Sequence, residues 1–203
     1  MKTNVYGGLL VAFDGPNGVG KSTLIEHVKF ELVNLGLETF TTKEPSDTQL
    51  GHFTRQIAEH LDGESLTCLV AADRYHHLKE IVIPQLQMRR IVITDRYILS
   101  SLILQCMDGV ETEFVLSANG NIIVPDLQVA VNADVSTLQA RLNERNQLTR
   151  FERGQRSSEE LRFMDLGIAA LKKRNVNVLE VDNTGELTES VSIIMKKILE
   201  VSK

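Results

Sequence analysis

The chain has 203 residues, of which 42% are hydrophobic and 24% charged, and its formal net charge is −5. This size predicts one domain with a substantial core, and the composition is that of an ordinary globular protein. The acidic balance argues against a nucleic-acid polymer or a membrane surface as partner, although a small polyanionic substrate needs only a local cluster of positive charge.

Short apolar runs alternate with longer periodic segments along the whole chain. We predict strands near residues 8–14, 37–42, 90–95, 126–131 and 176–181. Helices are predicted over residues 21–35, 47–61, 64–88, 97–118 with a break near Asp108 and Gly109, 134–146, 157–174 and 187–202. This alternation is typical of a parallel sheet covered by helices on both faces. No repeat or shift in composition marks a second domain, so residues 1–203 are expected to form a single one.

The cysteines and the first residues bear on the cellular compartment. Cys68 and Cys106 stand in apolar helical contexts without the spacing of metal ligands. We interpret both as buried thiols in a reducing compartment. The chain begins without an apolar signal core, and no apolar run approaches the length of a membrane span. A cytoplasmic protein is therefore expected.

A phosphate-binding loop is predicted between the first strand and the first helix. The segment FDGPNGVGKSTL, residues 13–24, contains the G-x-x-x-x-G-K-S pattern directly after an apolar run. Glycines let successive N–H groups point into one concavity at a helix N-terminus, where an anion binds. A lysine then reaches the outer phosphates, and a serine hydroxyl can bind Mg²⁺. We assign ATP binding to Gly15, Pro16, Asn17, Gly18, Val19, Gly20, Lys21, Ser22 and Thr23. The alternative is a glycine-rich turn that binds nothing.

An arginine-rich segment stands apart from the rest of the chain. Residues 141–156, RLNERNQLTRFERGQR, contain five arginines and little apolar periodicity after Leu148. Such a stretch cannot bury itself, so we predict a mobile surface lid over about residues 145–157. A solvated helix face is the alternative. The excess of arginine in an acidic chain favours contact with phosphate.

Polar residues follow two of the predicted strands, where open parallel sheets bind ligands. Lys43, Glu44 and Pro45 follow the second strand, and Asp95 and Arg96 end the third. Asp95 could instead cap a helix, and Glu44 could merely stabilise a turn.

Asp73 and Arg74 lie within a predicted helix and could be an ordinary exposed pair. His76 and His77, adjacent on the same helix, are interpreted as surface or packing residues.

Together these pieces resemble the thymidylate kinase family of P-loop nucleoside-monophosphate kinases. The resemblance spans nearly the whole chain in the family's order: the phosphate loop, Glu44-Pro45, Asp73-Arg74, Asp95-Arg96-Tyr97 with Ser100 and Gln105, Pro125-Asp126-Leu127, Arg150-Phe151-Glu152 and Val181-Asp182-Asn183. It implies a three-layer α/β/α fold with a five-stranded parallel sheet. It also implies a homodimer that transfers the γ-phosphoryl group of ATP, with Mg²⁺, to a pyrimidine deoxynucleoside monophosphate.

The resemblance implies roles for individual residues. Asp95 would join Ser22 at the metal, Arg96 would hold the acceptor phosphate, and Arg74 would reach the acceptor base or its phosphate. Catalytic groups would be Lys21, Asp95, Arg96, Arg150 and Arg153. Arg145 and Asp182 would complete the ATP site. Acceptor contacts would come from Asp14, Asn17, Glu44, Val70, Arg74, Arg96, Ser101, Leu104 and Gln105.

The chain departs from the family's pattern mainly around the acceptor. Val70 and Leu104 stand where the family commonly has aromatic residues, and Asn17 stands where it often has an acid that binds the sugar 3′-hydroxyl. Thr149 replaces an aspartate, and Lys43 replaces an arginine. A stacked aromatic ring contributes about 1 kcal/mol, so base recognition could be redirected while phosphoryl transfer persists. Another nucleotide or small-molecule acceptor therefore stays open, as does a non-catalytic ATP-binding switch.

Overall fold

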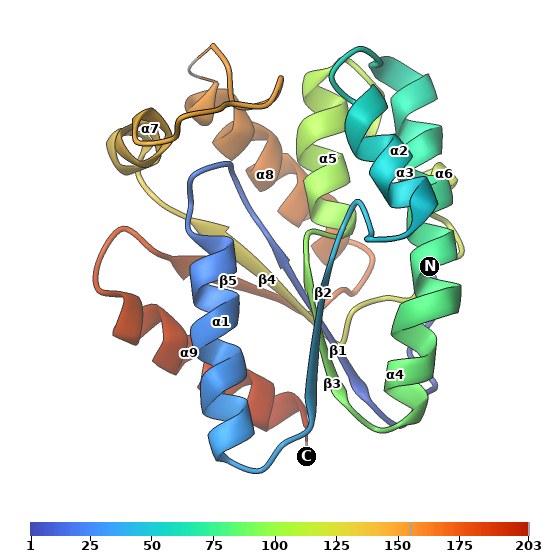
Figure 1. The fold of residues 1–203 in the computed structure, drawn as a ribbon, viewed down its shortest axis with the longest axis vertical. Coiled ribbons are helices and arrows are strands. Elements are labelled where there is room, and N and C mark those ends of the chain that lie inside the picture. The colour runs from blue at the N-terminus through green and yellow to red at the C-terminus, as the bar shows by residue number, and fades with distance from the viewer. Residues whose placement is uncertain (155, 203) are drawn as a thin grey trace.

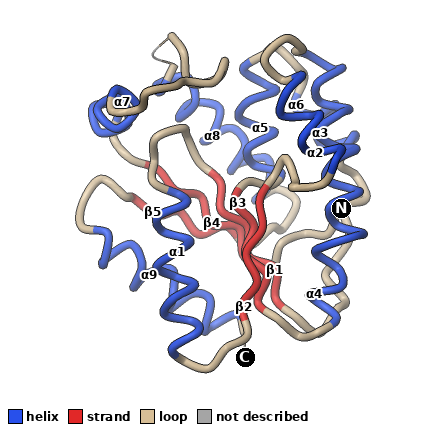
Figure 2. The backbone as a smooth tube through the Cα atoms, viewed as in Figure 1, coloured by secondary structure: helices blue, strands red, loops and turns tan. Residues whose placement is uncertain are grey.

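The structure is a computed structural model that describes residues 1–154 and 156–202. Its sheet consists of β1 (Leu9–Asp14), β2 (Thr39–Lys43), β3 (Ile91–Asp95), β4 (Leu127–Asn132) and β5 (Val178–Asp182). All pairs are parallel, in the order β2-β3-β1-β4-β5. Figure 2 shows this sheet in the middle of the molecule with helices on both sides. The predicted three-layer α/β fold with a five-stranded parallel sheet is confirmed.

The helices follow the predicted segments, with ends shifted by a few residues. They are α1 (Lys21–Asn34), α2 (Gln49–Ile57), α3 (Gly63–His77), η1 (Leu78–Val82), α4 (Ile83–Gln87), α5 (Ile98–Met107), α6 (Thr112–Ala118), α7 (Val135–Asn143), α8 (Ser157–Lys172) and α9 (Leu187–Val201). The break expected near Asp108 and Gly109 separates α5 from α6, and Gly109 has a φ of 87°.

The core lies on both faces of the sheet because successive strand residues point to opposite sides. In β1, Leu10 and Ala12 join the apolar cluster beneath α4, α5 and α8, whereas Val11 and Phe13 join the cluster beneath α1 and α9. All four side chains are fully buried. β1 is thus the centre of the molecule, and the loop that follows it has a rigid base.

The predicted helix over 64–88 is one continuous rod with a wider turn inside it. In η1 the N–H of Ile83 bonds to the carbonyl of Leu78, five residues earlier. Pro84 follows directly and has no N–H to continue the regular ladder, which accounts for the local change in pitch.

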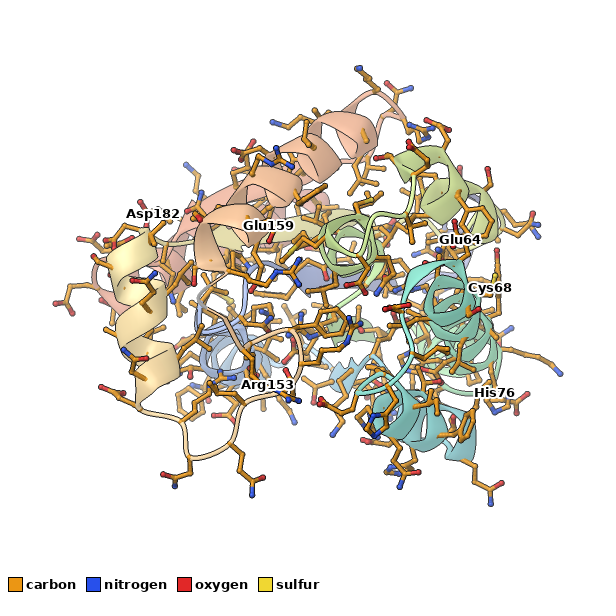
Figure 3. All side chains as sticks on the ribbon, turned by 90° about the horizontal axis from the view of Figure 1, so that it is seen from above. Glu64, Cys68, His76, Arg153, Glu159 and Asp182 are labelled. Atoms are coloured by element: carbon orange, nitrogen blue, oxygen red, sulfur yellow. The ribbon has the colours of Figure 1, made fainter. Side chains whose placement is uncertain are left out.

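The interpretation of both cysteines as buried is wrong for one of them. Cys106, in α5, is buried, but Cys68 is exposed. Figure 3 shows Cys68 and His76 on the outer side of α3. α3 presents one face to the protein, and its buried residues, Leu66, Ala71 and Arg74 among them, lie on that face, whereas Cys68 lies on the opposite one.

None of the helices in the described ranges combines the length and the apolar character needed to cross a bilayer.

Candidate active site

The predicted phosphate loop lies between β1 and α1 with the backbone that its glycines require. Gly15, Gly18 and Gly20 have φ values of 155°, 80° and 91°. A methyl group on Gly15 would lie 2.1 Å from the carbonyl oxygen of Val131 in β4, so the loop passes too close to the sheet for any side chain. The N-terminus of α1 opens directly after this turn, as anion binding demands.

Lys21 curls over the loop. Its Nζ donates to the carbonyl oxygens of Gly15 at 3.0 Å and Pro16 at 2.9 Å. Burial, together with the nearby Arg96 guanidinium, lowers the pKa of Lys21 from 10.5 to about 7. A bound polyphosphate would favour the charged ammonium, because an opposite charge stabilises it.

Two oxygen groups suited to Mg²⁺ meet at the carboxyl end of β3. Ser22 Oγ donates to Asp95 Oδ2 at 2.8 Å. The register of the sheet explains this meeting, because Asp95 pairs with Phe13, just before the loop. Within the described residues no cluster of three or more His, Cys, Asp or Glu could hold a metal ion. A hydroxyl and a carboxylate fit Mg²⁺, which takes few protein ligands and shares its shell with water and phosphate.

A cavity of about 300 Å³ opens beside the phosphate loop. This is the lower end of the range for small-molecule sites. Its walls come from the phosphate loop, the β2–α2 loop, α2, α3, the start of α5 and the lid segment. The lining residues are Asn17, Lys43, Glu44, Pro45, Thr54, Arg55, Ala58, Glu59, Leu66, Val70, Arg74, Arg96, Ser100, Ser101, Leu104, Gln105, Thr149 and Phe151. All the predicted acceptor contacts are here except Asp14.

Arg74 forms the floor of this cavity. Its side chain is 1% exposed, and Nε donates to Glu44 Oε2 at 2.7 Å. Its other nitrogens donate to Asn119, Ser101 and the backbone of Tyr97. The alternative of an ordinary exposed pair at Asp73 and Arg74 is therefore wrong.

Asp73 is also buried, at 1% exposed, and holds the loop after β2. It accepts from the backbone N–H of Ser46 at 2.7 Å and from its hydroxyl at 2.6 Å. His77 packs behind the same loop, in contact with Thr42 and Glu44.

Arg96 faces the cavity from the end of β3. Its φ of 74° lies in the left-handed region, which residues with side chains seldom adopt. Its Nη2 donates to Asn17 Oδ1 at 2.7 Å, and Nη1 to Ser100 Oγ at 3.3 Å. Gln105 also lines the cavity, and its Oε1 is buried without a partner among the described residues. A ligand that brings both an anion and a hydrogen-bond donor would suit this wall.

Asp14 does not line the cavity, contrary to the expectation. It is fully buried, and its carboxylate accepts from the backbone N–H groups of Tyr97 at 2.8 Å and Ser100 at 3.0 Å. Gln128 donates to its second oxygen at 3.0 Å. A carboxylate at this position caps the start of α5, so Asp14 supports the acceptor wall from beneath.

The lid arginines bond to acidic side chains, and none of these arginines lines the cavity. Arg150 makes two hydrogen bonds with Asp108, at 3.0 and 2.8 Å, and its backbone N–H donates to Glu59. Arg153 pairs with Glu59, and Arg145 pairs with Glu152. Figure 3 shows Arg153 on the loop that joins α7 to α8.

The lid is not wholly a surface segment, because Glu152 is only 8% exposed. Within the predicted lid, Gln155 lies outside the described residues.

Two residues to which we assigned no site role lie on the other side of the phosphate loop. Arg141 donates to the carbonyl oxygens of Val19 at 3.2 Å and Asn183 at 3.1 Å, and Asn183 Nδ2 donates to Val19 at 2.8 Å. Asp182, predicted to contact ATP, directly precedes Asn183 at the end of β5 and is exposed. The adjacency of β4 and β5 brings this side together, where Asn183 belongs to the Val181-Asp182-Asn183 motif and Arg141 begins the arginine-rich segment.

Glu160 was also not predicted. It lies on the first turn of α8, is 2% exposed, and accepts from Asn17 through both the backbone N–H at 2.8 Å and the side-chain amide at 3.1 Å. Burial raises the pKa of Glu160 above its usual 4.5, against the opposing effect of these hydrogen bonds.

Comparison with known proteins agrees with this geometry. A family model described as thymidylate kinase matches residues 13–194. The chain is 39% identical over 149 residues to a probable thymidylate kinase of Caldivirga maquilingensis, an alignment that covers 71% of this chain and 73% of the relative. It is 28% identical over 197 residues to a probable thymidylate kinase of Pyrococcus abyssi, covering 93% and 96%. A thymidylate kinase of Caldicellulosiruptor saccharolyticus is 38% identical over 130 residues, covering 60% and 63%.

The site thus combines a phosphate loop, a serine and an aspartate suited to Mg²⁺, and a cavity lined by arginines. The relatives compared above are all named thymidylate kinase or probable thymidylate kinase. The chain belongs to the thymidylate kinase family and is an ATP-dependent phosphotransferase with a nucleotide-binding site.

Proposed function

We propose that this protein transfers the γ-phosphoryl group of ATP to dTMP, forming dTDP. The observation that carries the proposal is the position of the cavity: it adjoins the phosphate loop, and Arg96 and Arg74 lie in its wall. An acceptor phosphate at Arg96 would lie close to the ATP phosphates held by the loop. The names of the relatives support thymidylate as the acceptor.

The reaction requires positioning and charge neutralisation more than covalent chemistry. Lys21 and the loop N–H groups would hold the outer phosphates of ATP, while Arg96 orients the acceptor phosphate for in-line attack. Ser22 and Asp95 would hold Mg²⁺, which supplies positive charge to the transferred group. A lid arginine would complete the charge at the transition state, and removing it should lower turnover by about a thousandfold.

The acceptor pocket can recognise a base although it lacks two of the family's rings. Val70 and Leu104 are aliphatic, but Phe151 enters the lining from the lid segment. The Arg150 guanidinium lies 4.1 Å from the centre of the Phe151 ring and orients it. Gln105 Oε1 can accept a hydrogen bond from a ring N–H, and an aromatic face with one polar anchor suits a pyrimidine.

The test is a panel of nucleoside monophosphates supplied with ATP and Mg²⁺, with ADP release as readout. Phosphorylation of dTMP should exceed that of the other acceptors. If another nucleotide or a small hydroxyl compound is turned over far faster than dTMP, the chain is a thymidylate-kinase-like enzyme with a different acceptor.

A variant tests whether the site is catalytic or only binds ATP. Lys21→Ala should abolish phosphoryl transfer while circular dichroism shows the wild-type fold. Wild-type protein that binds ATP tightly but phosphorylates no acceptor would support a non-catalytic switch.

We further propose that the protein is cytoplasmic and that it forms a homodimer. Light scattering at several concentrations would test the dimer. A concentration-independent mass of a single chain would reject the dimer.

A further inference from the structure

Asn17 is held in one orientation by two charged neighbours on opposite sides. Its Oδ1 accepts from Arg96 Nη2 at 2.7 Å, and its Nδ2 donates to Glu160 Oε2 at 3.1 Å. An amide has one acceptor and one donor end, so the two contacts cannot both form with the amide reversed. The backbone N–H of Asn17 donates to the same carboxylate oxygen at 2.8 Å. These bonds link the phosphate loop, the end of β3 and the start of α8.

Charge also connects the same residues. Lys21 and Arg96 carry positive charge close to Glu160, and each acts on its carboxyl group. Asn17 and Lys21 are 4% and 6% exposed, and Glu160 is 2% exposed. Charges at this depth are weakly screened by solvent. Without the carboxylate, two cations would face each other with no counter-charge from α8.

We propose that Asn17 and Glu160 act as one unit, in which the carboxylate on α8 adds to the negative charge of Asp95 and Asp14 near Lys21, and the Asn17 amide bridges this carboxylate to the guanidinium of Arg96. Glu160 is then a positioning residue for the acceptor-phosphate arginine. The unit also explains why the loop carries an amide, since an aspartate at position 17 would place two carboxylates in contact. This inference rests on the proposed role of Arg96.

The sharpest test exchanges the two functional groups. Asn17→Asp alone should raise the KM for the acceptor at least about tenfold, within the coupling range for residues in direct contact. Combining Asn17→Asp with Glu160→Gln restores one carboxylate and one amide at the contact. The double variant should recover to within about threefold of wild type.

The matched control is Glu159→Gln, which removes a carboxylate one position away on α8. Glu159 pairs with Arg156 and is partly exposed, so the kinetic constants should change little. Each variant is also measured for ATP affinity by calorimetry and for its thermal unfolding midpoint. The dissociation constant for ATP should change less than the KM for the acceptor, because the Asn17 side chain bonds to Arg96, which lies on the acceptor side.

Additive effects would overturn the proposal. The double variant would then be at least as impaired as Asn17→Asp alone, both in its kinetics and in its unfolding midpoint. Failure of the proposed function gives a different result. Wild-type protein would phosphorylate no monophosphate, while the coupling between positions 17 and 160 would still be measured from unfolding midpoints and ATP affinity.

Discussion

The buried ion pair between Arg74 and Glu44 allows a quantitative prediction. Both side chains are nearly inaccessible, at 1% and 3% exposed, and Nε lies 2.7 Å from Oε2. Glu44→Gln keeps the shape and one acceptor but leaves the Arg74 charge buried without its counter-charge. Removing one partner of such a pair costs about 3–5 kcal/mol. Because the amide oxygen still accepts from Nε, we expect a loss near the lower value, about 3 kcal/mol.

The protein offers a matched control at the surface. Arg90 Nε and Glu38 Oε2 are 3.0 Å apart, but these side chains are 35% and 72% exposed. Glu38→Gln should therefore cost less than about 1 kcal/mol. For a chain of this size, about 3 kcal/mol corresponds to a fall of roughly 6–12 °C in the unfolding midpoint. Urea unfolding with linear extrapolation gives both free energies.

The double variant Glu44→Gln with Arg74→Met separates the ion pair from other effects. Because Arg74→Met removes the guanidinium that Glu44→Gln leaves unpaired, the double variant should lose less free energy of unfolding than the two single variants together. If Glu44→Gln costs no more than Glu38→Gln, or if the two single losses simply add, burial of this pair does not have the consequence that we assign to it.

Two further predictions concern the walls of the site. A methyl group on Gly51 would lie 2.0 Å from the carbonyl oxygen of Ser46, so Gly51→Ala should displace the β2–α2 loop and raise the KM for the acceptor about tenfold or more, with ATP affinity unchanged as the check. Burial raises the pKa of Glu160, which faces Lys21 and Arg96, so the folded state binds more protons than the unfolded state above about pH 4.5. The free energy of unfolding thus loses this contribution as pH rises through the folded pKa. Glu160→Gln should gain stability relative to wild type as pH rises above about 4.5 in urea titrations, and a difference that does not change with pH would contradict the shift.

The phosphate loop and the order of elements could be predicted from sequence because their signals are local. Glycine spacing constrains the backbone directly, and the alternation of apolar runs with periodic segments reports which residues face a core. Hence the strands, the helices and the residues from Gly15 to Thr23 lie where they were expected. The family resemblance placed Ser22 and Asp95 together, and their contact agrees with the topology, because Asp95 ends β3, Ser22 lies in the first turn of the helix after β1, and these strands are neighbours in the sheet.

The tertiary structure alone decided the contacts between segments distant in the chain. Glu160 reaches Asn17 across 143 positions, and Arg150 reaches Asp108 across 42. Neither carboxylate differs locally from the many solvated acids of this chain. For Asp14 the sequence predicted a site contact that the structure does not contain. The orientation of β1 directs its carboxylate to the start of α5 rather than into the cavity. Sequence determines which backbone forms and which residues need burial, whereas the partner of a buried charge depends on how the packed helices bring remote side chains together.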